Sequence, residues 1–232
     1  MDLFYLPFID TTASTIIFPK EESRHIAKVL RKQAGDQLQL TDGKGLEVIV
    51  EIEQIGLNQL SAKLLNKKRH LPSRVHLHLG IAPTKNISRM EWFLEKATEI
   101  GIQEITPLVC DHSERKVIKP ERLEKIIIAA LKQSKQYNKP LLNPMLSFKE
   151  FIAHKNEGFI AHCHKGEKIP LFQALESKNK ITILIGPEGD FSRAEIAAAS
   201  AKNFQAVSLG NQRLRTETAA IIATHTVALK AQ

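Results

Sequence analysis

Two segments of the chain combine glycine turns with charged side chains, and each could bind a ligand. The first spans residues 185–192 and reads IGPEGDFS. Two glycines around a proline and a glutamate make a tight turn and let a ligand approach the backbone closely. A phosphate-binding loop would carry Lys and then Ser or Thr after the second glycine, where this chain has Asp190 and Phe191. The segment therefore favours a neutral or cationic ligand, with an ordinary strand-to-helix turn as the alternative.

The second segment spans residues 209–220 and reads LGNQRLRTETAA. Arg213, Arg215 and Glu217 crowd the predicted start of an otherwise apolar helix. A glutamate suits the first turn of a helix, whereas two arginines there oppose the helix dipole. Sequences that break a local rule tend to do so at functional sites. The alternative is a surface helix start with an Arg–Glu pair of little energetic weight.

Strands and helices alternate from residue 76 onward, and this alternation would position both segments. The periodicity predicts strands at 75–82, 105–109, 159–162, 181–186 and 206–209. It predicts helices at 90–100, ended by Gly101, from Pro120, from the capping box at 192–195, and at 216–229. Such alternation is typical of an α/β domain with a mainly parallel sheet. Ligands of open sheets bind beyond the carboxyl ends of the strands, where both segments would lie.

Residues 1–72 form a separate, β-rich region in this prediction. Alternating runs at 37–40 and 46–52, flanked by glycine turns, predict two strands. Ser23 is expected to cap a short helix that contains Ile26, Val29 and Leu30. The polar, basic stretch 66–72 ends in proline and is interpreted as a linker or domain edge. The chain is therefore divided into domains 1–72 and 73–232.

The composition excludes several classes of protein. Of the 232 residues, 43% are hydrophobic and 25% are charged, which is ordinary for a soluble globular protein. The apolar runs are far shorter than the roughly 20 residues of a membrane span, and the N-terminus lacks a signal-peptide pattern. Two cysteines suit a reducing cytoplasm.

The net charge of +8 is concentrated, because residues 115–139 alone carry +6. A basic face of this kind attracts a phosphate backbone, although a solvated helix face is an equally supported interpretation.

The sequence does not predict a metal site. The run His162-Cys163-His164 has metal-binding residue types, but alternation along a strand would point Cys163 away from its neighbours. A further Cys or His cluster with four-ligand spacing is also missing. Cys110 has no catalytic partner in the sequence and is expected to be a small buried hydrophobe.

Taken together, the two glycine-containing segments resemble the signature of the RsmE family, ribosomal RNA uridine-N3 methyltransferases of the SPOUT superfamily. The N-terminal HIAKVLR at 25–31, KATEIGI at 96–102 and the Gln-Ser pair at 133–134 also match the family pattern, so the resemblance covers nearly the whole chain. Two positions depart from it. Asp190 stands where the family usually has a second glycine, and the Gln-Ser pair lacks its usual preceding Glu and following Arg.

The resemblance implies a fold and an activity. The fold would be a small PUA-like β-barrel domain for RNA, followed by an α/β SPOUT methyltransferase domain with a C-terminal trefoil knot. The activity would be methylation of N3 of a uridine in 16S ribosomal RNA of the small subunit, with S-adenosylmethionine as the methyl donor. The protein would be a cytoplasmic homodimer. The cofactor-binding residues implied are Leu184, Gly186, Pro187, Glu188, Gly189, Leu209, Gly210 and Leu214.

The chemistry of such a transfer suggests roles for two further residues. Uracil N3 carries a proton and becomes a good nucleophile only when it loses it, so a proton acceptor and a positive charge near the carbonyl oxygens are needed. Arg215 is the candidate for the carbonyl contact. Glu217 is the candidate acceptor or its orienting group, or it fixes Arg215 structurally. Charge placement predicts RNA contacts from Arg31, Lys67, Lys68, Arg69, Lys116, Lys119 and Arg122.

Two other functions fit the same sequence. A non-catalytic RNA-binding or ribosome-assembly protein could keep this fold without using the methyl donor. A SPOUT enzyme could also modify another RNA or another base atom, because one fold serves many sites.

Overall fold

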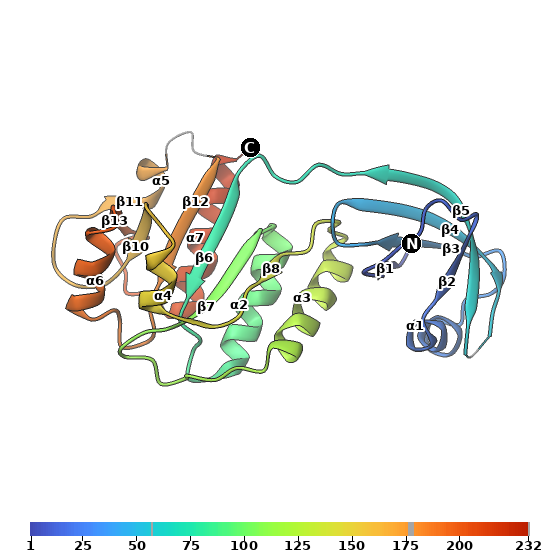
Figure 1. Cartoon of the computed structure of the whole chain (residues 1–232), viewed down its shortest axis with the longest axis horizontal. Helices are drawn as coiled ribbons and strands as arrows, with labels where there is room; N and C mark the ends of the chain where they lie inside the picture. The colour runs from blue at the N-terminus through green and yellow to red at the C-terminus, as the bar shows by residue number, and fades with distance from the viewer. Residues whose placement is uncertain (57, 176–178, 232) are drawn as a thin grey trace. The chain divides into compact units, whose positions relative to one another are not determined.

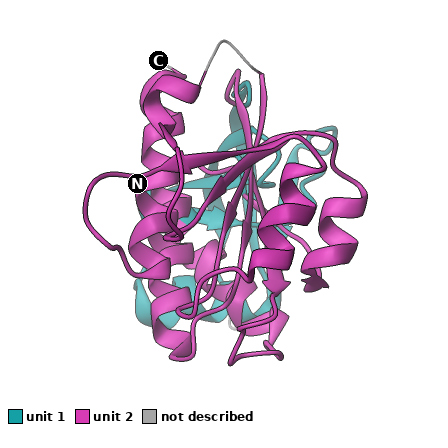
Figure 2. Cartoon of the chain, turned by 90° about the vertical axis from the view of Figure 1, so that its left-hand side faces the viewer, with its two compact units in different colours: residues 1–72, 131–139 teal, residues 73–130, 140–232 magenta. Residues whose placement is uncertain are grey.

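The computed structural model describes residues 1–56, 58–175 and 179–231. Contacts between Cα atoms divide the chain into two compact units (Figure 2). Unit 1 comprises Met1–Pro72 together with Leu131–Lys139, and unit 2 comprises Ser73–Ala130 together with Pro140–Gln232. In the part of the chain that is described, none of the helices has the length and apolar character needed to cross a bilayer.

Unit 1 is built on a five-stranded sheet with the order β1-β3-β4-β5-β2. The strands are β1 Leu3–Tyr5, β2 Thr15–Phe18, β3 Gln37–Thr41, β4 Leu46–Gln54 and β5 Leu60–Arg69. Strand β1 is parallel to β3, and the other pairs are antiparallel. Alternate residues of the strands, such as Leu38, Val48 and Leu60, are fully buried in one core. The two strands expected at 37–40 and 46–52 are therefore confirmed as β3 and β4.

The expected Ser23 cap was wrong, and of the stretch 66–72 only the end is a domain edge, because unit 1 ends at Pro72. The helix α1 spans Lys20–Arg24 and continues into a π-helical turn, η1, at His25–Val29, so Ser23 lies inside the helix rather than at its cap. The buried Ser23 hydroxyl instead donates to Pro19 O (2.9 Å) and accepts from Leu60 N (3.0 Å), which ties the helix to β5. Residues 66–69 are the end of β5, because their backbone pairs with β4 as far as the pair Leu46 and Arg69.

The segment Leu131–Lys139 belongs to unit 1, although the sequence division had placed it in the second domain. Gly45 N donates to Tyr137 O, and Lys139 N donates to Gly43 O, both at 2.8 Å. The ring of Tyr137 also stacks on that of His70, with centroids 4.1 Å apart and an interplanar angle of 11°. These contacts join residues more than sixty positions apart, so local periodicity cannot reveal them.

Unit 2 contains a parallel sheet with the order β11-β13-β10-β12-β6-β7-β8, and β9 adds to β7 (Figure 1). Its strands are β6 His76–Ile81, β7 Glu104–Val109, β8 Leu141–Leu142, β9 Leu146–Ser147, β10 Gly158–Ala161, β11 Ile169–Pro170, β12 Lys180–Ile185 and β13 Phe204–Ser208. Its helices are α2 Ile87–Ile100, the start of α3 Pro120–Ser134, α4 Phe148–Ala153, α5 Leu171–Ala174, α6 Arg193–Ser200 and α7 Thr216–Lys230. The predicted α/β fold with a parallel sheet is confirmed.

The central strand β12 is buried on both faces, as a covered parallel sheet requires. Ile181, Ile183 and Ile185 lie in the core shared with α2, α5 and α7. Leu184 points to the opposite face, where it packs with the aromatic side chains around α4 and the start of α6. The helices therefore cover both faces of the sheet and leave the strand ends as the places where loops can form a site.

Local signals fix where the helices next to those loops begin and end. Gly101 ends α2 in the left-handed conformation, with φ of 97°. Ser192 and Glu195 form the predicted capping box at the start of α6. Glu195 is itself buried, and its Oε1 accepts the Asp111 N–H at 3.0 Å, so this cap also holds the loop after β7.

Candidate active site

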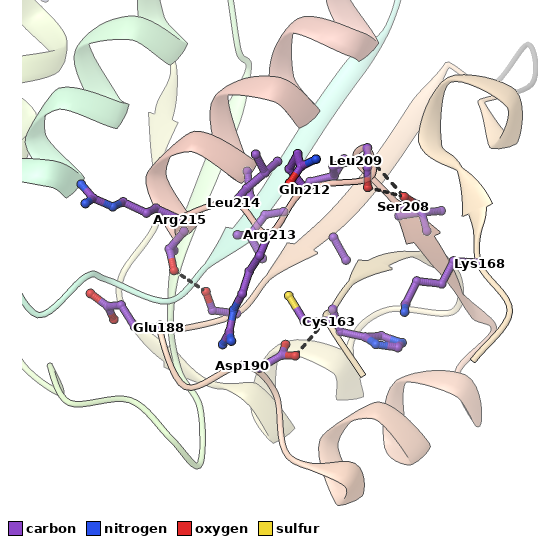
Figure 3. Close-up of a pocket in the computed structure, with 18 of the residues that line it drawn as sticks. Cys163, Lys168, Glu188, Asp190, Ser208, Leu209, Gln212, Arg213, Leu214 and Arg215 are labelled. Atoms are coloured by element: carbon purple, nitrogen blue, oxygen red, sulfur yellow. Dashed lines mark hydrogen bonds between the residues drawn. The ribbon is translucent and has the colours of Figure 1, made fainter. Parts of the chain in front are cut away.

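A cavity of about 670 Å³ lies at the carboxyl ends of three neighbouring strands (Figure 3). The segments that follow β12, β10 and β13 each supply part of its lining. This volume is within the range of small-molecule sites, and the position is the one expected for an open parallel sheet. The lining residues are Ala161, His162, Cys163, Lys168, Ile185, Gly186, Pro187, Glu188, Asp190, Val207, Ser208, Leu209, Gly210, Asn211, Gln212, Arg213, Leu214, Arg215, Thr216 and Ala219.

The two segments singled out in the sequence meet at this cavity. The Thr216 hydroxyl, at the start of α7, donates to Gly186 O at 3.0 Å. Gly186 is buried, and a Cβ there would lie 3.1 Å from the ring of Phe191. Since Phe191 is fully buried in the core, it has little room to yield, and a glycine fits this position best.

The structure brings most of the predicted cofactor residues together. Gly186, Pro187, Glu188, Leu209, Gly210 and Leu214 all line the cavity. Leu184 does not, because its side chain is fully buried in the core beneath the cavity. Gly189 is also outside the lining, and its carbonyl oxygen accepts from His112 Nδ1 at 3.0 Å.

The two arginines of the second segment have different directions. Arg213 and Arg215 are both exposed and both line the cavity. Figure 3 shows the Arg213 side chain running toward Asp190, while Arg215 extends the opposite way, away from Cys163 and Lys168. Arg215 is the N-cap residue of α7, with φ −72° and ψ 157°, so it precedes the first helical turn. Its positive charge therefore lies at the positive end of the helix dipole, as the sequence predicted.

Glu217 lies outside the cavity lining and is buried against α2. Its Oε1 is 3.6 Å from Arg89 Nε, and only 8% of its side chain is exposed. Its Oε2 is buried without a hydrogen-bond partner among the described residues. The recorded partner of Glu217 is thus Arg89 on α2, and the predicted Arg215–Glu217 pairing is replaced by a contact between α7 and α2.

Sequence reasoning missed the third wall of the cavity, which His162, Cys163 and Lys168 provide. The prediction placed residue 162 in a strand, but β10 ends at Ala161, so strand alternation does not govern the residues after it. His162 and Cys163 consequently both line the cavity. The signal available in the sequence was the position of this segment directly after a buried parallel strand.

Charges of both signs surround the cavity. The acidic residues Glu188 and Asp190 and the basic residues Lys168, Arg213 and Arg215 all belong to its lining. Burial lowers the pKa of His162, and the nearby Lys168 lowers it further. Cys163 is exposed, whereas Cys110 is buried and its thiol pKa is raised by burial. In the described residues there is no group of three or more His, Cys, Asp or Glu side chains that could hold a metal ion.

The predicted RNA-contacting residues fall in both units. In unit 1, Arg31 and the adjacent Lys67, Lys68 and Arg69 are exposed. Lys67 Nζ donates to Thr11 O at 3.3 Å. In unit 2, Lys116 and Lys119 are exposed near the start of α3.

Arg122, the remaining predicted RNA contact, already has an acidic partner. Its Nη2 donates to Glu91 Oε2 on α2 at 3.0 Å, and its Nε is 2.5 Å from Glu91 Oε1. Because that pair offsets its charge, Arg122 is the weakest of the seven candidates for a phosphate contact.

Comparison with known families matches almost the whole chain. The model of an RNA methyltransferase domain matches residues 71–228, and that of an RNA methyltransferase PUA domain matches residues 18–65. The ribosomal RNA small subunit methyltransferase E of Rickettsia conorii is 32% identical over 204 residues, which is 86% of this chain and 83% of that protein.

Two solved structures share the fold over nearly their whole length. The crystal structure of a probable rRNA-methyltransferase from Porphyromonas gingivalis has a TM-score of 0.89 and 37% identity, and covers 98% of this chain and 97% of its own. The structure of ribosomal RNA small subunit methyltransferase E from Neisseria gonorrhoeae, bound to S-adenosyl methionine, has a TM-score of 0.89 and 26% identity. It covers 99% of this chain and 98% of its own.

Proposed function

The chain belongs to the RNA methyltransferase family, and on that premise we propose that it transfers the methyl group of S-adenosylmethionine to N3 of a uridine in 16S ribosomal RNA. The observation that carries the proposal is the cavity formed by the two signature segments, joined by the Thr216–Gly186 hydrogen bond. The small-subunit substrate follows from the names of the relatives, and the N3 position from the resemblance of the two motifs.

The residues of the cavity fit this cofactor. S-adenosylmethionine supplies an activated methyl group on a positively charged sulfur. The exposed carboxylate of Glu188 suits a cationic ligand, and Leu209 and Leu214 offer apolar surface for a flat base. The tight turn at Gly186 leaves the backbone accessible to a ligand. We assign cofactor binding to the six predicted residues that line the cavity.

The chain's own part in the transfer is positioning and electrostatics. Arg215 is exposed at the rim of the cavity, and we propose that its guanidinium stabilises the negative charge that spreads onto the uracil carbonyl oxygens. Glu217 is buried beside Arg89, which favours an orienting role for it over direct proton acceptance. The N3 proton then passes to another acceptor at the rim or to water.

The target base has to be unpaired or flipped, because base pairing hides N3 in a duplex. We propose that the PUA unit, through Arg31, Lys67, Lys68 and Arg69, and Lys116 and Lys119 of unit 2 contact the phosphate backbone. From the resemblance we also propose a cytoplasmic homodimer and a C-terminal trefoil knot.

Mass spectrometry of ribosomal RNA tests the product directly. Incubation of small subunits that lack the modification with this protein and the methyl donor should yield N3-methyluridine. A methyl group on another atom or in another RNA would favour the alternative of a SPOUT enzyme with a different target. Binding of tritiated S-adenosylmethionine separates an enzyme from a pure RNA-binding module, since the module should bind none.

A further inference from the structure

Asp190 occupies a backbone conformation that usually favours glycine. Its φ of 64° lies in the left-handed region, where a side chain carries a steric cost that glycine avoids. Asp190 N donates to Pro187 O at 2.9 Å, which closes the turn of the first segment. The aspartate therefore keeps a turn that a glycine would form more easily. What aspartate adds at this position, compared with glycine, is a carboxylate.

Both carboxylate oxygens of Asp190 accept backbone hydrogen bonds. Oδ2 accepts from Cys163 N at 2.7 Å, and Oδ1 accepts from Phe191 N at 2.9 Å. Only 15% of the side chain is exposed. Hydrogen bonds to an ionised acceptor are roughly twice as strong as neutral ones, so the link to Cys163 is a strong one. It joins the loop after β12 to the segment after β10.

The segment after β10 has few other attachments to the first loop. Its strand pairing ends at Ala161, which lies beside Ile185 and Val207. Beyond that point, His164 Nε2 donates to Phe191 O at 2.8 Å, and Lys168 Nζ donates to His164 O within the segment itself. These hydrogen bonds to residues 190 and 191, together with His164 Nε2 at 3.8 Å from Asp190 Oδ2, hold the third wall of the cavity, which includes His162, Cys163 and Lys168, against the first loop.

We propose that Asp190 is a positioning residue whose carboxylate fixes the segment 162–168 as a preformed wall of the cofactor cavity. The inference rests on the proposed function for the identity of the ligand. A preformed wall lowers the ordering cost of binding, so Asp190 contributes to cofactor affinity. It does not act on the reacting atoms, so the rate with saturating cofactor should depend little on it.

Two substitutions separate the carboxylate from the fold. Asp190→Gly removes both hydrogen bonds and suits the left-handed conformation, so the variant is expected to fold. Asp190→Asn keeps one acceptor oxygen for the Cys163 N–H and removes the charge. Asn203→Gly is the matched control, because Asn203 also has a positive φ, of 59°, and its side chain donates one hydrogen bond, to Asn156 O. Asn203 directly precedes β13, so it lies at the amino end of that strand, whereas the cavity lies at the carboxyl end.

Amide hydrogen exchange in the cofactor-free protein reports the link itself. In Asp190→Gly the Cys163 amide should exchange at least about tenfold faster, the change expected when one charge-assisted hydrogen bond is lost. Asp190→Asn should restore most of the protection, and the control should leave it unchanged. Unchanged exchange in Asp190→Gly would overturn the proposal.

Calorimetric binding and steady-state kinetics report the consequence. The Kd for S-adenosylmethionine should rise about tenfold in Asp190→Gly, with kcat at saturating cofactor within about twofold of wild type. Equal losses of affinity in the Gly and Asn variants, with Cys163 still protected in the Asn variant, would mean direct charge recognition and would refute positioning. A wild-type protein that binds no S-adenosylmethionine would refute the proposed function, while the exchange measurement would still decide the role of Asp190.

Discussion

The two ends of the parallel sheet in unit 2 both gather ionisable side chains, but they use them differently. At the amino ends of β6 and β7, His76 Nε2 lies 2.8 Å from Glu104 Oε2, and Asn143 Nδ2 donates to Glu104 Oε1 at 2.7 Å. The buried His78 lies between Thr106 Oγ1 and Lys155 Nζ, at 2.7 and 2.9 Å. These groups form a network in which each member has partners.

At the carboxyl ends, by contrast, the charged groups surround a cavity. Arg213 and Arg215 line it with exposed side chains, and Glu188 and Lys168, each of which also makes one backbone hydrogen bond, complete the charged lining. Titratable residues alone therefore do not identify a site, because a mutually satisfied cluster contributes to stability whereas a cluster open to a cavity can bind a ligand. Substitutions at the carboxyl edge should therefore change binding and catalysis, and those at the amino edge should change stability.

The largest expected effect is at the carboxyl edge. Arg215→Ala should lower methyl transfer to small subunits by about a hundredfold or more, because it removes a charge that stabilises the transition state. Its melting temperature and affinity for S-adenosylmethionine should stay near wild type. Arg193→Ala, at an exposed position on α6, is the control. Wild-type turnover by Arg215→Ala would remove this residue from the chemistry.

At the amino edge the largest effect should come from Glu104→Ala. The substitution leaves His76, His78 and Asn143 without their shared acceptor, and should lower the free energy of unfolding by about 2 to 3 kcal/mol. Urea unfolding measures the change, and methyl transfer by the folded variant should stay normal. If the variant lost activity without losing stability, the division of roles between the two edges would be wrong.

The same edge should make stability depend on pH. Burial lowers the pKa of His78 from 6.5 to about 4, against the opposing effect of Glu104 and with a further contribution from Lys155. The unfolded chain therefore binds the proton first as the pH falls. The free energy of unfolding should be highest above pH 6.5 and should drop by about 2 kcal/mol between pH 6.5 and 4. His78→Gln should flatten the slope in that window, and an equally steep slope in the variant would place its origin elsewhere.

The smallest effect concerns a thiol in the cavity. Cys163 is exposed and lines the cavity, whereas Cys110 is buried, so an alkylating reagent should modify Cys163 first. S-adenosylmethionine should slow that alkylation by about five- to tenfold when it fills most of the sites. Peptide mass spectrometry identifies the modified cysteine. An alkylation rate that is indifferent to the methyl donor would indicate that the ligand binds elsewhere.

Sequence reasoning worked best where local chemistry decides the structure. The Ser192–Glu195 capping box and the Gly101 helix end depend on a few neighbouring residues, and both were predicted. The strands β6, β7, β12 and β13 were also found near their observed positions, since each contains a short segment rich in apolar residues. The meeting of the two signature segments then followed from the rule for carboxyl ends of parallel strands.

The misses involve contacts between distant parts of the chain. Ser23 was mistaken for a cap because its true partner, Leu60 N, is thirty-seven positions away. The basic residues at the end of β5 look like a linker, and only the pairing with β4 makes them a strand. The third wall of the cavity was missed because it depends on β10 lying between β12 and β13, an order that periodicity does not specify.

Because Leu131–Lys139 belongs to unit 1, a fragment meant to contain the whole of unit 1 has to include it. A gene truncated after codon 72 would omit Tyr137, and with it the ring stacked on His70 and the carbonyl that accepts the Gly45 N–H. Such a fragment would leave part of its surface uncovered and would tend to aggregate. Splicing residues 131–139 onto it through a short flexible connection would supply the missing piece.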